Sequence, residues 1–463
     1  MTVSLLLILL LGLSGLAYIL GKERSRHLEA GPGAGSGRLH SRPGYYGLLT
    51  AICCLLPALL LIVCWTACAD RVMTGLALQT LPADVRNLPP DRLTLLVNDL
   101  HNLVAGHVAV RNVDPVLQKA AERYRHLDQT GRMVLSGLCG VIAILSTTLV
   151  LARIRPAMRA RNYVERMIRL GLVFCAAIAI FTTVGIVLSV FFESIRFFRQ
   201  VPLTDFLFGL KWSPQIALRA DQAGSSGSFG AVPVLCGTVM ISAIALAVAV
   251  PIGLMSAIYL AEYAAPRVRA RVKPALEILA GVPTVVYGFF AALVVAPFIR
   301  DLGALAGLDV SSESGLAAGL VMGIMIIPFV SSLSDDVISG VPQAMRDGSY
   351  GLGATQSETI VRVVLPAALP GIVGGILLAA SRAIGETMIV VMAAGLAANL
   401  TANPLRSVTT VTVQIVTLLV GDQEFDSPKT LAAFALGLLL FFITLFLNVI
   451  ALYVVRNYRE VYE

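Results

Sequence analysis

The sequence predicts an all-α polytopic membrane protein with about nine transmembrane helices, and three observations indicate this fold class. Of the 463 residues, 57% are apolar and only 14% are charged, whereas soluble domains average roughly 45–50% apolar and about 25% charged. The apolar residues gather in runs of about 20, the length with which a helix crosses the hydrocarbon core. The basic residues gather in short segments between these runs, so the net charge of +7 indicates cytoplasmic loops rather than a nucleic-acid partner.

Nine runs are candidate spans. Each is expected to be helical, because a single apolar segment satisfies all its backbone groups in lipid only as a helix. The runs cover residues 4–20, 46–68, 133–152, 170–192, 233–259, 275–298, 315–333, 371–396 and 431–456.

Three basic segments set the expected orientation. Residues 21–45, 152–169 and 260–274 each hold four or more basic residues, mostly arginine, and an even number of spans separates any two of them. They therefore lie on one side of the membrane, which is the cytoplasm by the positive-inside rule. This arrangement places the C-terminus in the cytoplasm and the N-terminus outside.

We expect three regions along the chain. Residues 1–160 form an N-terminal extension with three spans and an outside segment, 69–131, whose Leu and Val spacing predicts amphipathic helices. Residues 161–232 hold one span and an outside loop. Residues 233–457 form a compact block of five spans with short connections. The extension carries no motif that indicates a function, and contact of its basic loops with membrane lipid is expected.

The stretch 341–366 lies between two spans and predicts a first short helix on the cytoplasmic side. Pro342 suits the first turn of a helix. Gly351 and Gly353 suit its C-terminal end, because glycine accepts the left-handed conformation that closes many helices. The sequence therefore predicts a turn at these glycines.

A second short helix is expected directly after this turn. Thr355 and Glu358 have the spacing of a capping box, in which each side chain satisfies a backbone amide at the start of the helix. Pro366 is expected to close this helix. The whole stretch would then be a compact helix–turn–helix between two spans.

Two charged residues lie inside the predicted span 371–396. Arg382 and Glu386 are four residues apart, which places them on one face of a continuous helix. A charge at the bilayer centre costs about 2.5–3.5 kcal/mol on insertion scales, so such residues normally face a cavity and mark function. Arginine suits bidentate oxyanion binding, and the acid could hold the arginine or accept a proton from the oxyanion. A buried ion pair that only fixes helix packing is the alternative interpretation.

The predicted span 275–298 contains Gly281, Pro283 and Gly288. Glycine and proline inside an apolar run predict a kink or an interrupted helix, and the free amides of an interrupted helix favour an anion. Close helix packing at small residues explains the glycines equally well.

The stretch 341–366 resembles the cytoplasmic loop of ABC importer permeases. In that family Glu-Ala-Ala is followed at fixed spacing by a glycine and by Ile-x-Leu-Pro. Gly353 matches the glycine, and Leu365 with Pro366 lies at the required distance, while Val363 replaces the isoleucine. Asp347-Gly348-Ser349 stands in place of Glu-Ala-Ala and keeps the acid, although its glycine lowers helix propensity by about 1 kcal/mol.

Further motifs resemble those of phosphate ABC transporter permeases of the PstC type. They are the Arg-Ala-Ile-Gly-Glu-Thr run that ends at Thr387, the run 280–288, and the outer-loop runs 206–214 and 229–238. The resemblance implies an ABC importer type I permease core in the C-terminal half. It also implies the function of a permease subunit of an ATP-driven phosphate importer in the bacterial inner membrane.

The resemblance further implies partners and site residues. The partners are a second permease, a dimer of ATP-binding subunits and an extracytoplasmic phosphate-binding protein. The expected substrate-pathway residues are Arg382, Glu386 and Thr387. The loop expected to dock on the ATP-binding subunit includes Asp347, Gly348, Ser349, Gly353, Thr355, Glu358, Leu365 and Pro366.

Other functions stay open or are disfavoured by the sequence. A permease for another oxyanion, such as sulfate or molybdate, fits the same physical features, and a secondary transporter could couple protons through Glu386. A membrane-embedded enzyme is disfavoured, because all five histidines precede residue 127. The chain has no Gly-x4-Gly-Lys-Ser/Thr loop for ATP, so we expect no cofactor, no metal and no catalytic residue here, and ATP hydrolysis in a partner chain.

Overall fold

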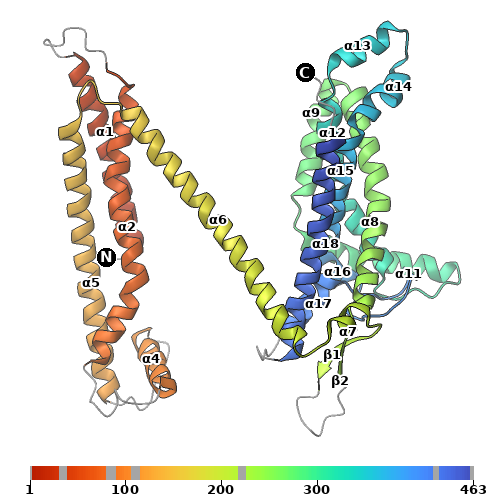
Figure 1. Cartoon of the computed structure of the whole chain (residues 1–463), viewed down its shortest axis with the longest axis horizontal. Helices are drawn as coiled ribbons and strands as arrows, with labels where there is room; N and C mark the ends of the chain where they lie inside the picture. Colours follow the sequence, from red (N-terminus) through yellow and green to blue (C-terminus); the bar gives the residue numbers. More distant parts are fainter. Residues whose placement is uncertain are drawn as a thin grey trace. The chain divides into compact units, whose positions relative to one another are not determined.

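The computed structural model describes residues 3–30, 39–79, 90–105, 115–216, 226–420 and 427–458. Within these ranges nine helices are long and apolar enough to cross a membrane, which confirms the predicted fold class. The chain divides into two compact units, Met1–Ile180 and Phe181–Glu463, and each is described by itself (Figure 1). The predicted division into three regions stays a prediction.

The first unit is a bundle of long helices. Its elements are α1 (Val3–Ala30), α2 (Pro43–Leu78), α4 (Pro90–Ala105), α5 (Pro115–Arg153) and the first part of α6 (Ala160–Phe198). α1, α2 and α5 lie side by side (Figure 1), and small buried residues such as Ala17, Ala58 and Cys139 line their contacts. α4 packs on α5 through Leu100, which is fully buried. Residues 80–89 and 106–114 of the predicted outside segment lie outside the described residues.

The second unit holds the rest of the chain. It begins with the end of α6 and continues with α7 (Leu203–Phe208), β1 (Trp212–Ile216), β2 (Ser226–Phe229), α8 (Val232–Ile258), η1 (Tyr259–Tyr263), α9 (Pro266–Ala280), α10 (Thr284–Phe290), η2 (Ala291–Val295), α11 (Ala296–Leu305), α12 (Gly315–Ser339), α13 (Gln343–Gly351), α14 (Gln356–Thr359), η3 (Ile360–Val364), α15 (Leu365–Ile384), α16 (Met388–Ala393), α17 (Val411–Leu419) and α18 (Pro428–Tyr458). The segments η1, η2 and η3 are π-helical. β1 and β2 form a two-stranded antiparallel hairpin, a small addition to the helical fold.

α8 and α12 form the closest helix pair of this unit. A Cβ atom on Gly319 would lie 2.7 Å from the Ile244 side chain, and one on Gly323 would lie 2.9 Å from the Ala245 carbonyl oxygen. One helical turn or more away, a Cβ on Gly253 would lie 2.9 Å from Val330. Small residues at these levels let the two backbones approach each other, as is common between membrane helices.

The helix that starts at α14 does not end at Pro366, so that prediction is wrong. It runs continuously from Gln356 to Ile384. The π-helical segment η3 precedes the proline, and the Leu365 amide donates to the Ile360 carbonyl, five residues back. A proline removes one amide donor and crowds the preceding turn, and a wider π-helical turn is one way to accommodate such a disruption. The stretch 341–366 is therefore one short helix followed by the start of the next span.

The predicted span 371–396 is not one helix. α15 ends at Ile384 with Gly385 as its C-cap, and α16 begins at Met388. Glycine is a poor helix former, and here α15 ends two residues after Arg382. The predicted span 275–298 is interrupted as well, since α9 ends at Ala280 and α10 begins at Thr284.

Candidate functional site

Arg382 lies in the last turn of α15, with its side chain exposed in this single chain. Its guanidinium carbon lies 5.4 Å from the centre of the Phe329 ring, a cation–π contact with α12. Within the described part of the chain, no carboxylate forms an ion pair with Arg382. The planar fork of Arg382 is therefore left available to a ligand.

Glu386 does not share a helical face with Arg382, so that prediction is wrong, because α15 ends between them. One Glu386 carboxylate oxygen accepts a hydrogen bond of 3.0 Å from the Met388 amide at the start of α16. The Thr387 hydroxyl donates to the Gly385 carbonyl at 3.4 Å, and the Glu386 carbonyl accepts from Thr412 at 2.9 Å. Glu386 and Thr387 thus shape the turn that follows Arg382.

The break after α9 lies next to this turn, because α10 packs against α16. The Gly281 amide donates to the Glu277 carbonyl at 3.2 Å and the Ile278 carbonyl at 3.0 Å, which closes α9. Pro283 is the N-cap of α10 in an extended conformation. The Tyr287 hydroxyl donates to the Leu279 carbonyl at 2.9 Å, so a backbone acceptor near the break keeps a partner.

Gly288 plays a different part from Gly281 and Pro283. It lies inside α10, where an added Cβ would stand 2.7 Å from the Met392 sulfur and 3.1 Å from the Met388 carbonyl oxygen. This glycine permits close packing of α10 on α16. The structure therefore brings the interrupted span and the Glu386 turn together, with Gly288 between them as a packing residue.

The turn within the stretch 341–366 has the predicted local geometry. α13 ends at Gly351, and Gly353 has a φ of +84°, a conformation that favours glycine. Thr355 and Glu358 form the capping box: the Thr355 amide donates to the Glu358 carboxylate at 2.9 Å, and the Glu358 amide donates to the Thr355 hydroxyl at 3.4 Å.

The residues in place of Glu-Ala-Ala lie on α13. Asp347 accepts a hydrogen bond of 3.0 Å from the Gln343 side chain. The Ser349 hydroxyl lies 2.9 Å from the Thr359 hydroxyl and joins the two helices. A Cβ on Gly348 would meet nothing within 4 Å, so the shape of this structure does not require a glycine there.

Sequence reasoning missed a buried ion pair that holds this stretch. The Arg346 and Glu262 side chains are 9% and 8% exposed, and their closest nitrogen and oxygen atoms are 2.8 Å apart. Arg346 also donates to the Ile338 carbonyl at 2.8 Å and to the Val341 carbonyl. α13 is thereby joined to η1, which continues α8, and to the end of α12. The available signal was the single acid at the start of the basic segment 260–274, directly after an apolar run.

A second cluster was also missed. Asp335 on α12 is buried and pairs with Arg269 at 2.9 Å and with Lys273 at 2.8 Å, both on α9. These hydrogen bonds raise the pKa of Lys273, so its ammonium group stays charged. The available signal was the Ser-Asp-Asp sequence at the end of an apolar run.

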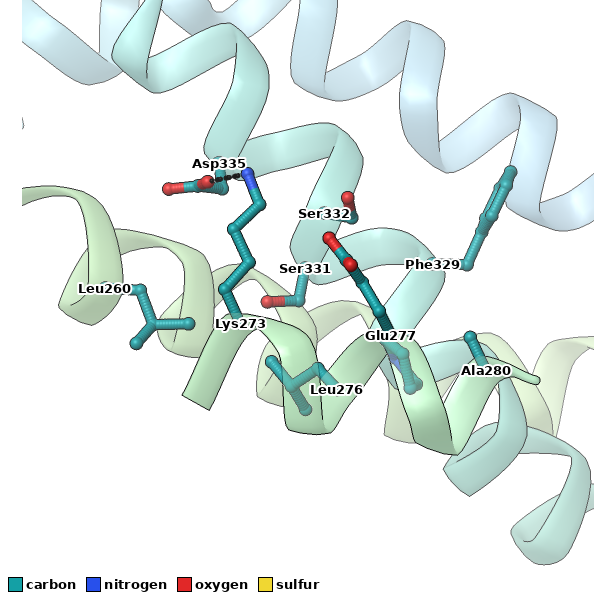
Figure 2. Close-up of a pocket in the computed structure, with 10 residues that line it drawn as sticks. Leu260, Lys273, Leu276, Glu277, Ala280, Phe329, Ser331, Ser332 and Asp335 are labelled. Atoms are coloured by element: carbon teal, nitrogen blue, oxygen red, sulfur yellow. Dashed lines mark hydrogen bonds and ion pairs between the residues drawn. The ribbon is translucent and has the colours of Figure 1, made fainter. Parts of the chain in front are cut away.

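The Lys273–Asp335 pair lies at a cavity of about 220 Å³ between α9 and α12 (Figure 2). Ser331 and Ser332 line it from α12 and Glu277 lines it from α9. Phe329 of α12 lines it as well, with its ring directed away from the serines (Figure 2). The remaining lining residues are Leu260, Leu276, Ala280 and Pro328. Because the Phe329 ring contacts Arg382, the cavity and the Arg382 side chain have this residue as a common neighbour.

Comparison with known proteins places this architecture in a family. Residues 5–182 match the family described as a phosphate ATP-binding cassette transporter, and residues 249–460 match the binding-protein-dependent transport system inner membrane component. The chain is 31% identical over 268 residues to a probable ABC transporter permease, YqgH of Bacillus subtilis, covering 58% of this chain and 82% of that protein. It is 36% identical over 247 residues to the phosphate transport system permease PstC of Mesorhizobium japonicum, covering 50% and 74%. This chain belongs to the phosphate ABC transporter permeases.

The permease is therefore a membrane-spanning transport component, which confirms the resemblance seen in its motifs. Its first unit nearly coincides with the match over residues 5–182, although no motif in that region indicated a function. A solved bacterial alginate ABC transporter, in complex with an alginate-bound periplasmic protein, has a TM-score of 0.45 and 15% identity, covering 65% of this chain and 99% of that one.

Proposed function

We propose that this permease forms the phosphate pathway of an ATP-driven importer together with a second permease. The observation that carries the proposal is Arg382, which has no ionic partner among the described residues and lies in the last turn of α15, beside the interrupted span. A charged residue of a membrane permease without an ionic partner favours a role in binding substrate. Relatives that are named phosphate transport system permeases support phosphate as that substrate.

The proposed partners are a dimer of ATP-binding subunits inside and a phosphate-binding protein outside. α13, Gly353 and the capping box would dock on the ATP-binding subunit. The Arg346–Glu262 pair supports this role, because it joins α13 to η1, which packs at the end of α8, and would carry a displacement of the loop into the membrane. The orientation stays as proposed from the basic loops, with the C-terminus in the cytoplasm of a bacterial cell and the permease in the inner membrane.

The test is phosphate uptake by the assembled transporter. Arg382→Gln should lower uptake by at least tenfold while the protein still assembles with its partners, because a neutral amide cannot replace a charged fork. Arg382→Lys should retain part of the uptake. The matched control is Arg406→Gln. Arg406 is exposed, and its ion pair with the exposed Asp309 is long, at 4.0 Å, so phosphate uptake by this variant should be normal.

Uptake of labelled phosphate into proteoliposomes, with ATP inside, provides the measurement. Parental uptake by a correctly assembled Arg382→Gln transporter would contradict the role of Arg382. Transport by the permease without any ATP-binding subunit would contradict the ATP-driven class and favour a secondary transporter. Copurification of all subunits is the control for assembly.

A further inference from the structure

We propose that the cavity between α9 and α12 is a second, weak binding site for hydrogen phosphate, in which Glu277 selects the protonated oxyanion. This inference rests on the proposed function, because it adds a second binding site to the phosphate pathway. The site would receive phosphate after Arg382 and release it toward the cytoplasm.

The position of the cavity supports this order. One end is lined by Phe329, and the ring of this residue contacts the Arg382 guanidinium. The opposite end is the Lys273–Asp335 pair, and Arg269 continues the cluster to Ser339 at the end of α12, with a hydrogen bond of 3.0 Å. α13 follows shortly after α12, and Figure 1 shows α9 and α13 toward the same end of the second unit. The cavity therefore lies between Arg382 and the stretch 341–366.

The cavity offers hydrogen-bond donors that the protein does not use. Ser331 is only 1% exposed, yet neither its hydroxyl nor that of Ser332 hydrogen-bonds to another residue in the described ranges. A lysine ammonium has three donors, and Lys273 uses two of them, on Asp335 at 2.8 Å and on Asp336 at 3.2 Å. Two hydroxyls and one ammonium hydrogen remain for a ligand.

The cavity also offers one strong acceptor. Glu277 extends from α9 toward the serines of α12 (Figure 2), and its carboxylate has no hydrogen bond or ion pair with any described residue. An ionised carboxylate only accepts hydrogen bonds. It therefore fits a ligand that carries a hydrogen on one oxygen.

This combination of donors and one acceptor is complementary to hydrogen phosphate. Near neutral pH inorganic phosphate keeps at least one hydrogen, which can bind Glu277, while its other oxygens can accept from Lys273 and the serines. Sulfate carries no hydrogen and would place an oxyanion directly against the carboxylate. A site built to bind a ligand hydroxyl can discriminate against an analogue without it by up to about 10⁴-fold.

The size and the charge of the cavity suit a transit site. Its 220 Å³ is several times the roughly 30 Å³ that a water molecule occupies in the liquid, so an ion of five heavy atoms fits with some water. Asp335 and Asp336 balance the charges of Arg269 and Lys273, and the Glu277 carboxylate adds one negative charge. Binding is therefore expected to be weak, and conduction requires sites that a substrate can leave.

The test is protection of a cysteine placed in the cavity. In the assembled transporter, Ser332→Cys is reacted with a small thiol reagent, and labelling is quantified by mass spectrometry on the peptide that contains position 332. Inorganic phosphate at about three times its dissociation constant should slow labelling about fourfold, whereas sulfate at the same ionic strength should not. The matched control is Ser312→Cys, at an exposed position outside the cavity, which neither anion should protect.

The role of Glu277 is tested in the same assay. Adding Glu277→Gln to the Ser332→Cys chain should let sulfate protect about as well as phosphate, because the amide can donate and carries no charge. The Glu277→Asp variant, which keeps the carboxylate, should keep the preference for phosphate. Equal protection by both anions in the chain that retains Glu277 would overturn the proposal, as would protection by neither.

The outcomes separate this site from the proposed function. Phosphate import by the parental transporter without protection at position 332 would remove the second site and leave the importer function standing. Protection at position 332 does not require turnover, so a parental transporter that fails to import phosphate would disprove the proposed function while the site is measured independently.

Discussion

Arg346 and Arg382 are both arginines near a glutamate in the second unit, yet their surroundings are opposite. Arg346 is buried and bonded to the Glu262 carboxylate and to two carbonyl groups at the end of α12. Arg382 is exposed in this chain and contacts the Phe329 ring, while Glu386 is engaged with the Met388 amide. The charge of Arg346 is therefore fully satisfied by the protein, and that of Arg382 is not.

This difference separates a residue that holds the fold from one that is available for function. A fully bonded buried charge is costly to remove, because its partner is left buried without compensation. A charge without an ionic partner contributes little to stability and can be spared for a ligand. The comparison predicts that stability losses concentrate at Arg346 and that transport losses concentrate at Arg382.

The largest effect on stability is expected for Arg346→Met. Breaking a buried ion pair by removal of one partner costs about 3–5 kcal/mol, and here two carbonyl groups lose a donor as well. Thermal unfolding of the purified permease in detergent measures the change. Arg362→Met is the matched control, since Arg362 is exposed and should change stability by less than about 0.5 kcal/mol. Similar losses in the two variants would remove the contrast between the arginines.

An intermediate effect is expected at the turn after α13. Gly353→Val places a β-branched residue at a φ of +84°, and left-handed backbone costs about 1–2 kcal/mol for such residues. We expect the variant to lose association with the ATP-binding subunit while it still assembles with the second permease, as measured by copurification.

Gly348→Ala is the control for Gly353→Val. Gly348 lies inside α13 with nothing within 4 Å of an added Cβ, so alanine should stabilise the helix by up to about 1 kcal/mol and leave association intact. If the Gly353→Val permease still copurifies with the ATP-binding subunit, this stretch is not the docking element.

The smallest effect on stability is expected for Arg382→Gln. An exposed cation–π contact contributes about 0.5–1 kcal/mol, so the unfolding temperature should fall by only a few degrees even though uptake is lost. The same detergent assay as for Arg346→Met measures it. A loss as large as that of Arg346→Met would show that Arg382 is a structural residue and would undermine its proposed role in the pathway.

Local signals predicted much of this fold. Span length and hydropathy gave the nine candidate helices, because lipid leaves an apolar segment of that length few alternatives. The capping box at Thr355 and the turn at Gly353 depend on residues within a few positions of each other, so the sequence contains all their determinants.

Features that depend on context were not predictable in the same way. Arg346 and Glu262 are 84 residues apart in the chain, and the sequence around either residue does not indicate that the two form a pair. α15 ends at Ile384, which separates Arg382 from Glu386. This end was not predictable, because a continuous apolar run does not reveal where a glycine breaks the helix. The prediction that Pro366 ends a helix was wrong, because the π-helical turn before the proline accommodates it and the helix continues.

The close contact between α8 and α12 restricts how this permease can move. Backbone groups and branched side chains fill the space beside Gly319 and Gly323, and Val330 fills the space beside Gly253, so neither helix can slide along the other without collision. We therefore expect α8 and α12 to move together as one rigid pair during transport. The conformational change would then occur at the two helix breaks, between α9 and α10 at Gly281 and between α15 and α16 at Gly385, which would serve as hinges.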